Sequence, residues 1–268
     1  MANLKPNQFL LDGHIFSEIP LLFQTEMVQA VVTDRKNQTR RTRGLDEMNE
    51  NPDDWEFCWV GDTVINQKIT EFGTFFQHKK DRKQVRFIKS PYSKPGDLLW
   101  VRETWGMKNC GWSTLERRYN TILAYRADVE DQDVTWKPSI HMPKAACRIW
   151  LMVENIRVER LQDISGDDIF SEGVVVPVSE NNTIVFTLGK KNNAIDFLPD
   201  GFAAEGQPKL TGNQILFAHW AELWCKVNGR ESWDQNPWVW VVKFRTLSKT
   251  GRPSDELIVK NWKEVANG

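Results

Sequence analysis

The sequence predicts a mixed α+β fold, a β-barrel with short flanking helices and long loop insertions. Short segments in which apolar and polar residues alternate recur along the 268 residues, as they do in half-buried strands. Helix-like segments are short, and the pattern lacks the strand–helix–strand alternation of a doubly wound parallel sheet. A chain of this length is long enough to bury a sizeable core.

Two helices are predicted from the spacing of apolar residues. Thr25 can cap a helix over 26–33, whose apolar side chains share one face. The stronger pattern covers 213–226, where Trp220 and Trp224 are four residues apart and therefore lie on the same face. We predict that these two indoles belong to the core and do not form a stacking platform for a ligand.

Strands are expected where apolar and polar residues alternate or where β-branched and aromatic residues gather. The predicted strands cover 57–69, 98–102, 122–126, 147–159 and 238–244, and a hairpin with a Lys- and Arg-rich tip covers 70–89. Ser165 begins a further short helix, which ends near Glu172 because Gly173 is the type of residue that follows a helix C-terminus.

These elements predict one domain over 21–246, between an N-terminal arm at 1–20 and a polar C-terminal tail at 247–268. Insertions are expected where polar segments interrupt the pattern, near 44–56, 106–120 and 179–212.

Composition narrows the classes of function. The formal net charge is −1 at pH 7, so attraction for a polyanion has to come from a local patch. The four cysteines are far apart and form no Cys-x-x-Cys pair, which predicts neither a zinc site nor a disulfide framework. No segment approaches the roughly 18 consecutive apolar residues of a membrane span. We expect a cytoplasmic protein with no metal, no cofactor and no membrane partner.

The most concentrated cationic segment is Asp34-Arg35-Lys36-Asn37-Gln38-Thr39-Arg40-Arg41, followed closely by Arg43. Lys36 and Thr39 are three residues apart, so a helical or turn-like backbone places them side by side. Such a cluster can bind phosphate, can lower the pKa of a lysine by crowding like charges, or can be a solvated basic loop.

Two motifs carry a resemblance to a known family. Asp34-x-Lys36-x-x-Thr39-x-Arg41 resembles the Gly-x-Lys-x-x-Thr-x-Arg signature of ASCH domains, which belong to the PUA-like β-barrel superfamily. Lys94-Pro95-Gly96-Asp97 and the strand after it are similar to the Gly-Asp strand of that family. The similarity covers most of 21–246 outside the insertions and is to ASCH proteins common in bacteriophages and prophages. Asp34 replaces the glycine of the signature, and Asp tolerates a positive φ better than most residues.

The resemblance implies a protein that binds nucleic acid, RNA more than DNA, or a modified nucleoside, in a cleft lined by residues 35–43. A phage-encoded protein of this type would act in the host cytoplasm. Two alternatives stay open. One is a hydrolase, because some small ASCH proteins are amidohydrolases of N4-acylated cytidine and a relative is linked to ribonuclease activity. The other is an interaction protein that uses the barrel as a scaffold.

In the hydrolase alternative, the catalytic residues implied by the resemblance are Lys36, Thr39 and Glu172. Thr39 would attack an amide carbonyl, Lys36 would accept its proton, and Glu172 would protonate the leaving amine. Without the resemblance, the sequence around Glu172 favours a solvent-facing residue at a helix end, because charged residues are mostly exposed.

Other residues are candidates for binding around the same cleft. The candidates for nucleic-acid contact are Arg35, Arg40, Arg41, Arg43, Arg102 and Trp136, and those for the pocket are Glu103 and His141. Arg102 and Glu103 are equally consistent with an internal ion pair. His141, in a proline-bounded loop, is more typical of a hydrogen-bonded structural histidine than of a catalyst. Trp136 can stack on a base or close the end of the barrel.

Overall fold

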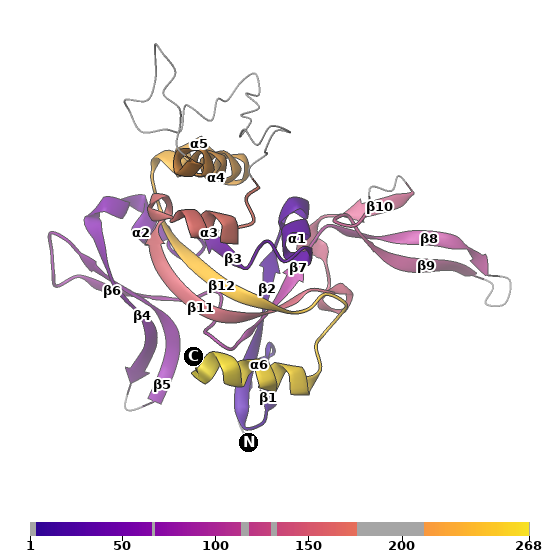
Figure 1. Ribbon diagram of the computed structural model, residues 1–268. Coiled ribbons are helices and arrows are strands. Elements are labelled where there is room, and N and C mark those ends of the chain that lie inside the picture. Colours follow the sequence, from indigo (N-terminus) through magenta and orange to yellow (C-terminus); the bar gives the residue numbers. More distant parts are fainter. Residues whose placement is uncertain (1–3, 66–67, 114–117, 130–132, 176–211, 268) are drawn as a thin grey trace, which may run out of the picture.

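The computed structural model describes residues 4–65, 68–113, 118–129, 133–175 and 212–267. Its fold is mixed α+β, with three sheets and helices packed around the largest of them (Figure 1). That sheet has six strands in the order β1–β2–β7–β11–β12–β3. Their bounds are β1 Gln8–Leu11, β2 His14–Leu22, β3 Gln38–Arg41, β7 Leu98–Arg102, β11 Trp150–Arg160 and β12 Trp238–Ser248.

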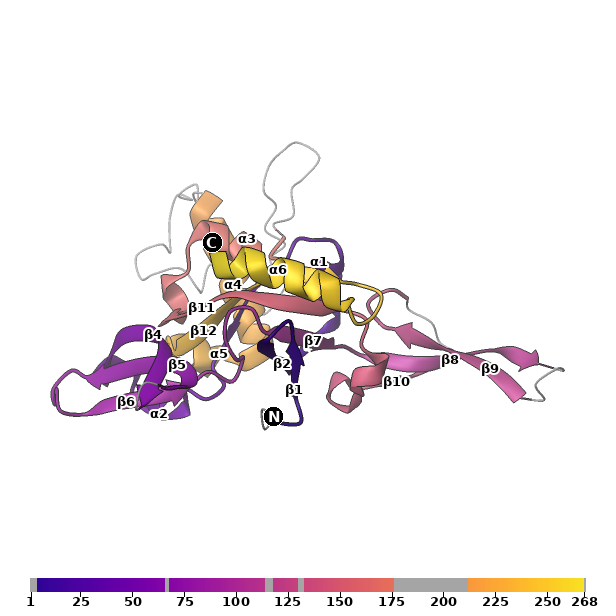
Figure 2. The same cartoon turned by 90° about the horizontal axis from the view of Figure 1, so that it is seen from below.

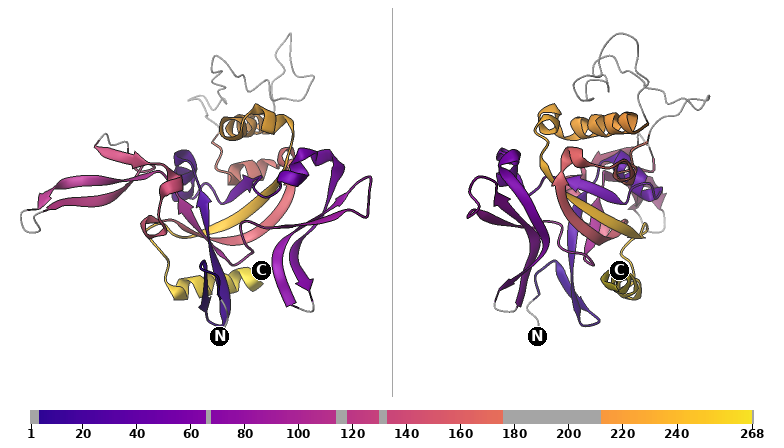
Figure 3. Two further views of the ribbon diagram at one scale, coloured as in Figure 1. Left: turned by 180° about the vertical axis from the view of Figure 1, so that it is seen from behind. Right: turned by 60° about the vertical axis from the view of Figure 1, so that its left-hand side comes forward.

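Two smaller antiparallel sheets extend to opposite sides of the main sheet (Figure 3). One consists of β4 (Trp55–Ile65), β5 (Lys68–His78) and β6 (Val85–Lys89). The other, in the order β10–β8–β9, consists of β8 (Trp105–Ser113), β9 (Arg118–Tyr125) and β10 (Val134–Lys137). The hairpin expected over 70–89 is therefore confirmed as β5–β6, with its basic tip exposed.

The helices are short apart from α4 and α6. Their bounds are α1 Thr25–Val32, α2 Asp46–Glu50, α3 Gly166–Ser171, α4 Gly212–Asn228, α5 Arg230–Asp234 and α6 Asp255–Asn267, and the 3₁₀ turns are η1 Pro52–Asp54, η2 Ser139–His141, η3 Lys144–Ala146 and η4 Leu161–Asp163. Helices α3–α5 pack at the end of the main sheet where β12 begins, and α6 lies along β11 (Figures 1 and 2). In the part of the chain that the structure describes, no helix is long and apolar enough to cross a membrane.

Strand β12 shows why its sequence is continuously apolar. Trp240 and Val242 pack into the core against the β4–β6 sheet, whereas Val239 and Val241 pack against α3–α5. Side chains alternate between the two faces of a strand, so a strand covered on both faces needs apolar residues at every position.

The main sheet is open in the part of the chain that the structure describes. Its edge strands β1 and β3 do not pair with each other, and no closed barrel is found among these residues. The mixed α+β class is confirmed at this level. The long apolar run expected over 147–159 is one strand, β11, with a register shift between Val153 and Asn155.

Several segments differ from their sequence-based prediction. The expected N-terminal arm contains β1 and β2, and β2 pairs in parallel with β7 inside the main sheet. The expected tail contains α6, whose Ile258 is buried. In the 44–56 segment, Leu45 and Met48 are also buried. Segment 106–120 lies largely within β8 and β9. These apolar residues pack on partners far away in the sequence, which local patterns do not show. Most of the 179–212 insertion lies outside the described residues.

The two indoles of α4 are confirmed as core residues. Trp220 and Trp224 are 3 % and 4 % exposed, and their ring centroids are 5.8 Å apart.

Truncating a buried tryptophan to alanine costs about 3–5 kcal/mol. We therefore expect Trp224→Ala to lower the melting temperature markedly, as measured by circular dichroism. Glu222→Ala, on the exposed side of the same helix, is the control and should change the free energy of unfolding by no more than about 0.5 kcal/mol. Equal melting of the two variants would contradict this packing.

Candidate functional site

The basic segment is a short connection between α1 and β3 that is held by backbone hydrogen bonds. It is not the solvated basic loop that the sequence allowed. Helix α1 ends at Val32, and Asp34 adopts a positive φ of 57°, as its place in the motif anticipated. The backbone N–H groups of Arg35 and Lys36 both donate to the carbonyl of Ala30, at 2.8 and 3.0 Å. The chain then continues into β3, so the positions of residues 36–41 are fixed by backbone hydrogen bonds.

Lys36 and Glu172 meet although they are 136 residues apart. Their backbones form an isolated bridge, and Lys36 Nζ donates to a carboxylate oxygen of Glu172 at 2.7 Å and to its carbonyl at 2.8 Å. The close approach needs a glycine next in sequence. Gly173 has a φ of +85°, and a Cβ there would lie 2.8 Å from that of Ala30. Both side chains are almost completely buried.

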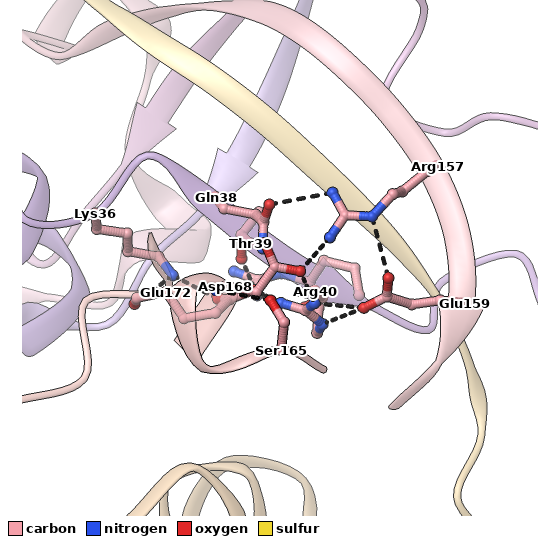
Figure 4. Close-up of polar contacts among 10 residues, drawn as sticks. Lys36, Gln38, Thr39, Arg40, Arg157, Glu159, Ser165, Asp168 and Glu172 are labelled. Atoms are coloured by element: carbon pink, nitrogen blue, oxygen red, sulfur yellow. Dashed lines mark hydrogen bonds and ion pairs between the residues drawn. The ribbon is translucent and has the colours of Figure 1, made fainter. Parts of the chain in front are cut away.

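Arg40 occupies the centre of a buried network of charges (Figure 4). Its guanidinium is fully buried and donates to Glu172 at 3.0 Å and to Asp168 at 2.9 Å. It also donates to Glu159, at 3.0 Å from Nε. Arg157 contacts Glu159 and Asp168 from the other side. Three cations, counting Lys36, thus share three carboxylates, and these groups come from the β3 segment, β11 and the α3 segment.

Burial and the neighbouring carboxylate have opposite effects on the pKa of Lys36. Removal from water lowers the pKa of its amine, because the charged form loses hydration, while the adjacent Glu172 carboxylate acts in the opposite direction. Burial dominates, so the pKa of Lys36 lies below its ordinary value. The cationic neighbours Arg40 and Arg41 lower it further. Crowding by like charge was expected from the sequence, but the larger cause is desolvation.

Thr39 is held by the arginine two residues later. Its side chain is fully buried, and its hydroxyl oxygen accepts from Arg41 Nη1 at 2.7 Å. The same guanidinium donates to the carbonyls of Arg40 and Leu22, at 2.9 and 3.0 Å. Its carbon lies 5.5 Å from the ring centre of Phe23. Arg41 therefore separates the hydroxyl of Thr39 from solvent.

A cavity of about 340 Å³ lies beside the network, between β3 and α4. Its buried surface is formed by Arg40, Glu172 and three aromatic rings, those of Phe23, Trp220 and Trp224. More exposed residues surround its opening, including Arg41, Arg43 and Ser139. The lining thus combines guanidinium groups, one carboxylate and an apolar aromatic wall. Lys36 and Thr39 are adjacent to these lining residues but do not line the cavity themselves.

The structure separates the predicted residues into two groups. Arg40, Arg41, Arg43 and Glu172 line the cavity, and the structure places Arg35, Arg102, Glu103, Trp136 and His141 outside it. Arg40 lines it as a buried member of an ion network, which argues against the expected role in contacting nucleic acid. Arg35 is exposed and donates to Thr33 and to the carbonyl of Gly173.

The remaining candidates have local partners. Glu103 is buried and forms a two-point ion pair with Arg148, with both distances 2.9 Å, and burial raises the pKa of its carboxyl. The internal ion pair considered for this residue therefore exists, with a different arginine. Arg102 donates to the carbonyl of Ile140. Trp136 lies in the β8–β10 sheet beneath the guanidinium of Arg126, and His141 is exposed on η2.

Sequence reasoning missed two parts of this site. The first is the aromatic wall, because Trp220 and Trp224 were assigned to the core alone. The second is the set of carboxylates around Arg40. A signal for them exists in the spacing. Asp168 on α3 is four residues before Glu172, which directly follows the helix, and Arg157 and Glu159 are two apart on β11. The pattern shows that each pair shares a face but not that the faces meet at Arg40.

Comparison with protein-family models, with curated proteins and with solved structures finds no match.

Removing Arg40 should destabilise the protein strongly. Arg40→Met keeps an unbranched side chain but leaves Glu159, Asp168 and Glu172 without the cation they share, and breaking a buried ion pair from one side costs about 3–5 kcal/mol. The control is Arg35→Met, an exposed arginine five residues earlier, which should cost no more than about 0.5 kcal/mol. Urea unfolding measures both. Similar free energies of unfolding for the two variants would show that the network does not stabilise the fold.

Proposed function

We propose that this chain is a divergent ASCH/PUA-like protein that binds a nucleobase-bearing ligand, either a nucleoside or a nucleotide of RNA, in the cavity between β3 and α4. The observation that carries the proposal is the composition of the cavity lining, which combines an aromatic wall with a carboxylate and three arginines, two of which, Arg41 and Arg43, make no ion pair among the described residues. The ASCH resemblance is supported by the meeting of Lys36 with Glu172, two residues that it assigned to one site. In this proposal the main sheet corresponds to the barrel of that superfamily, opened at its β1 and β3 edges.

Each part of the lining matches a part of such a ligand. Bases are flat and apolar on their faces, and the more exposed apolar residues of the cavity lining, Leu223 and Val227, would cover such a face, while the buried Trp220 and Trp224 support the lining from the core. Carboxylates accept hydrogen bonds from the amino groups of bases, and Glu172 is the carboxylate residue among the described residues that line the cavity. The volume of about 340 Å³ is within the range of about 300–1,000 Å³ typical of small-molecule sites.

The first test is direct binding. We expect isothermal titration calorimetry to detect binding of at least one member of a panel of ribonucleosides, modified nucleosides and RNA hexamers, with DNA hexamers as the comparison. Arg41→Gln should weaken that binding about tenfold or more, because a charge-assisted hydrogen bond is lost. The binding should also weaken as salt is raised.

The matched control is Lys83→Gln. Lys83 is exposed at the β5–β6 tip and has no ion pair among the described residues, so the substitution makes the same change in net charge far from the cavity. We expect it to leave affinity within about twofold. Absence of binding across the whole panel, or equal losses in Arg41→Gln and Lys83→Gln, would refute the proposal.

Hydrolysis of an acylated nucleoside is a second candidate, favoured by the contact of a buried lysine of lowered pKa with Glu172. In this mechanism the Thr39 hydroxyl attacks the amide carbonyl, and its proton goes to Lys36. The proton then passes through Glu172 to the amine as the carbon–nitrogen bond breaks, and water hydrolyses the acyl-threonine ester. Because Thr39 does not line the cavity, Arg41 must move aside before the reaction.

Three substitutions test this candidate with N4-acylated cytidine as substrate and mass spectrometry as the readout. Thr39→Ala should abolish turnover, and adding Lys36→Ala should change little further, because residues that act as a unit are not additive. Thr39→Ser should retain part of the activity, since it keeps the hydroxyl. Full turnover by Thr39→Ala would exclude a covalent threonine. If the wild type does not turn over the substrate, the chain is a binding protein.

A further inference from the structure

The charges around the cavity are balanced at its buried end and unbalanced at its opening. At the buried end, Lys36, Arg40 and Arg157 are matched by Glu159, Asp168 and Glu172. Glu172 is the one carboxylate among the described residues that line the cavity, and both of its oxygens already accept from cations. The buried end therefore has little net charge to offer an ionic ligand.

The two arginines at the opening have no such compensation. The guanidinium of Arg41 donates to a hydroxyl and to two backbone carbonyls, all of them neutral acceptors. Arg43 is exposed and makes no ion pair within the described part of the chain. An exposed guanidinium retains donors that match the oxygens of a phosphate in pairs.

Arg41 and Arg43 are two residues apart in the chain, and both line the same cavity. The backbone fixes the connection that carries them, because Leu45 N–H donates to the carbonyl of Thr42 at 2.9 Å. Two uncompensated cations therefore share one side of the cavity, and the indoles of α4 form the wall elsewhere.

We infer that the ligand is a nucleotide and not an uncharged nucleoside, with a phosphate held by Arg41 and Arg43 at the opening of the cavity. This inference rests on the proposed function. The ligand then has two unlike ends, a base that enters toward the aromatic wall and an anionic group that stays at the opening of the cavity. Both a free mononucleotide and a nucleotide within an RNA strand present this chemistry.

The experiment compares each of the four ribonucleosides with its 5′-monophosphate by calorimetry at low salt. In the wild-type protein the monophosphate should bind about tenfold more tightly or better than the nucleoside, because it gains charge-assisted hydrogen bonds. In Arg43→Gln the ratio of the two affinities should fall toward one. Lys83→Gln again controls for net charge and should keep the wild-type ratio. A dinucleoside monophosphate distinguishes a nucleotide within RNA from a free mononucleotide. If the site accepts an internal phosphodiester, this ligand should also bind more tightly than the nucleoside. If the site takes a free mononucleotide, it should bind no more tightly than the nucleoside.

The outcomes separate the two proposals. Binding of nucleoside and monophosphate with equal affinity overturns the phosphate subsite and leaves the nucleobase site standing. If Arg43→Gln keeps the wild-type ratio of monophosphate to nucleoside affinity, Arg43 does not hold the phosphate. If neither class of ligand binds, the proposed function fails, and the phosphate subsite fails with it.

Discussion

A fully buried guanidinium constrains this structure more than any other single group. Arg40 cannot be neutralised at physiological pH, so its burial requires carboxylates placed around it. They come from two places, Glu159 on β11 and the pair Asp168 and Glu172 on and just after α3. The charge of one side chain on β3 therefore sets where a strand and a helix from distant parts of the sequence must lie.

The cavity follows from that arrangement. Because Arg40 and Lys36 hold Glu172 from two directions, the carboxylate is fixed where the α3 segment meets β3. Helix α4 packs over the same end of the sheet through Trp220, whose ring centre is 5.7 Å from the guanidinium carbon of Arg40. The space left between these elements has a neutralised interior and a cationic opening at Arg41. This distribution of charge favours a ligand with an apolar end and an anionic end.

Local sequence predicts the elements whose signals are local. The cap at Ser165, the glycine after Glu172 and the spacing of the two α4 indoles each determine a helix boundary or face, and the structure confirms them. The motif around Lys36 also anticipated the positive φ at Asp34. Each of these depends on residues within about one helical turn, where backbone geometry limits the alternatives.

What sequence did not predict depends on contacts between distant segments. Arg40 was expected to contact nucleic acid because it belongs to the basic segment that the resemblance places along a cleft, and nothing near it in sequence indicates three carboxylate partners. Strand β2 was assigned to an arm because its partner, β7, is far away in the sequence. The buried Asp97, just before β7, accepts from the N–H of Ser17, which is 80 residues earlier, at 2.7 Å. The aromatic wall was missed for a related reason, since a tryptophan can be a core residue and line a cavity at once.

The central claim is that Arg40 and Glu172 are energetically coupled and that this coupling holds the α3 segment on β3. A double-mutant cycle of unfolding free energies with Arg40→Met, Glu172→Gln and the double variant tests it most directly. We predict that the double variant is less destabilised than the sum of the single variants by more than about 0.5 kcal/mol and up to about 3 kcal/mol, as found for residues that share one salt-bridge network. Additivity within about 0.5 kcal/mol, which is typical of independent sites, would contradict the account.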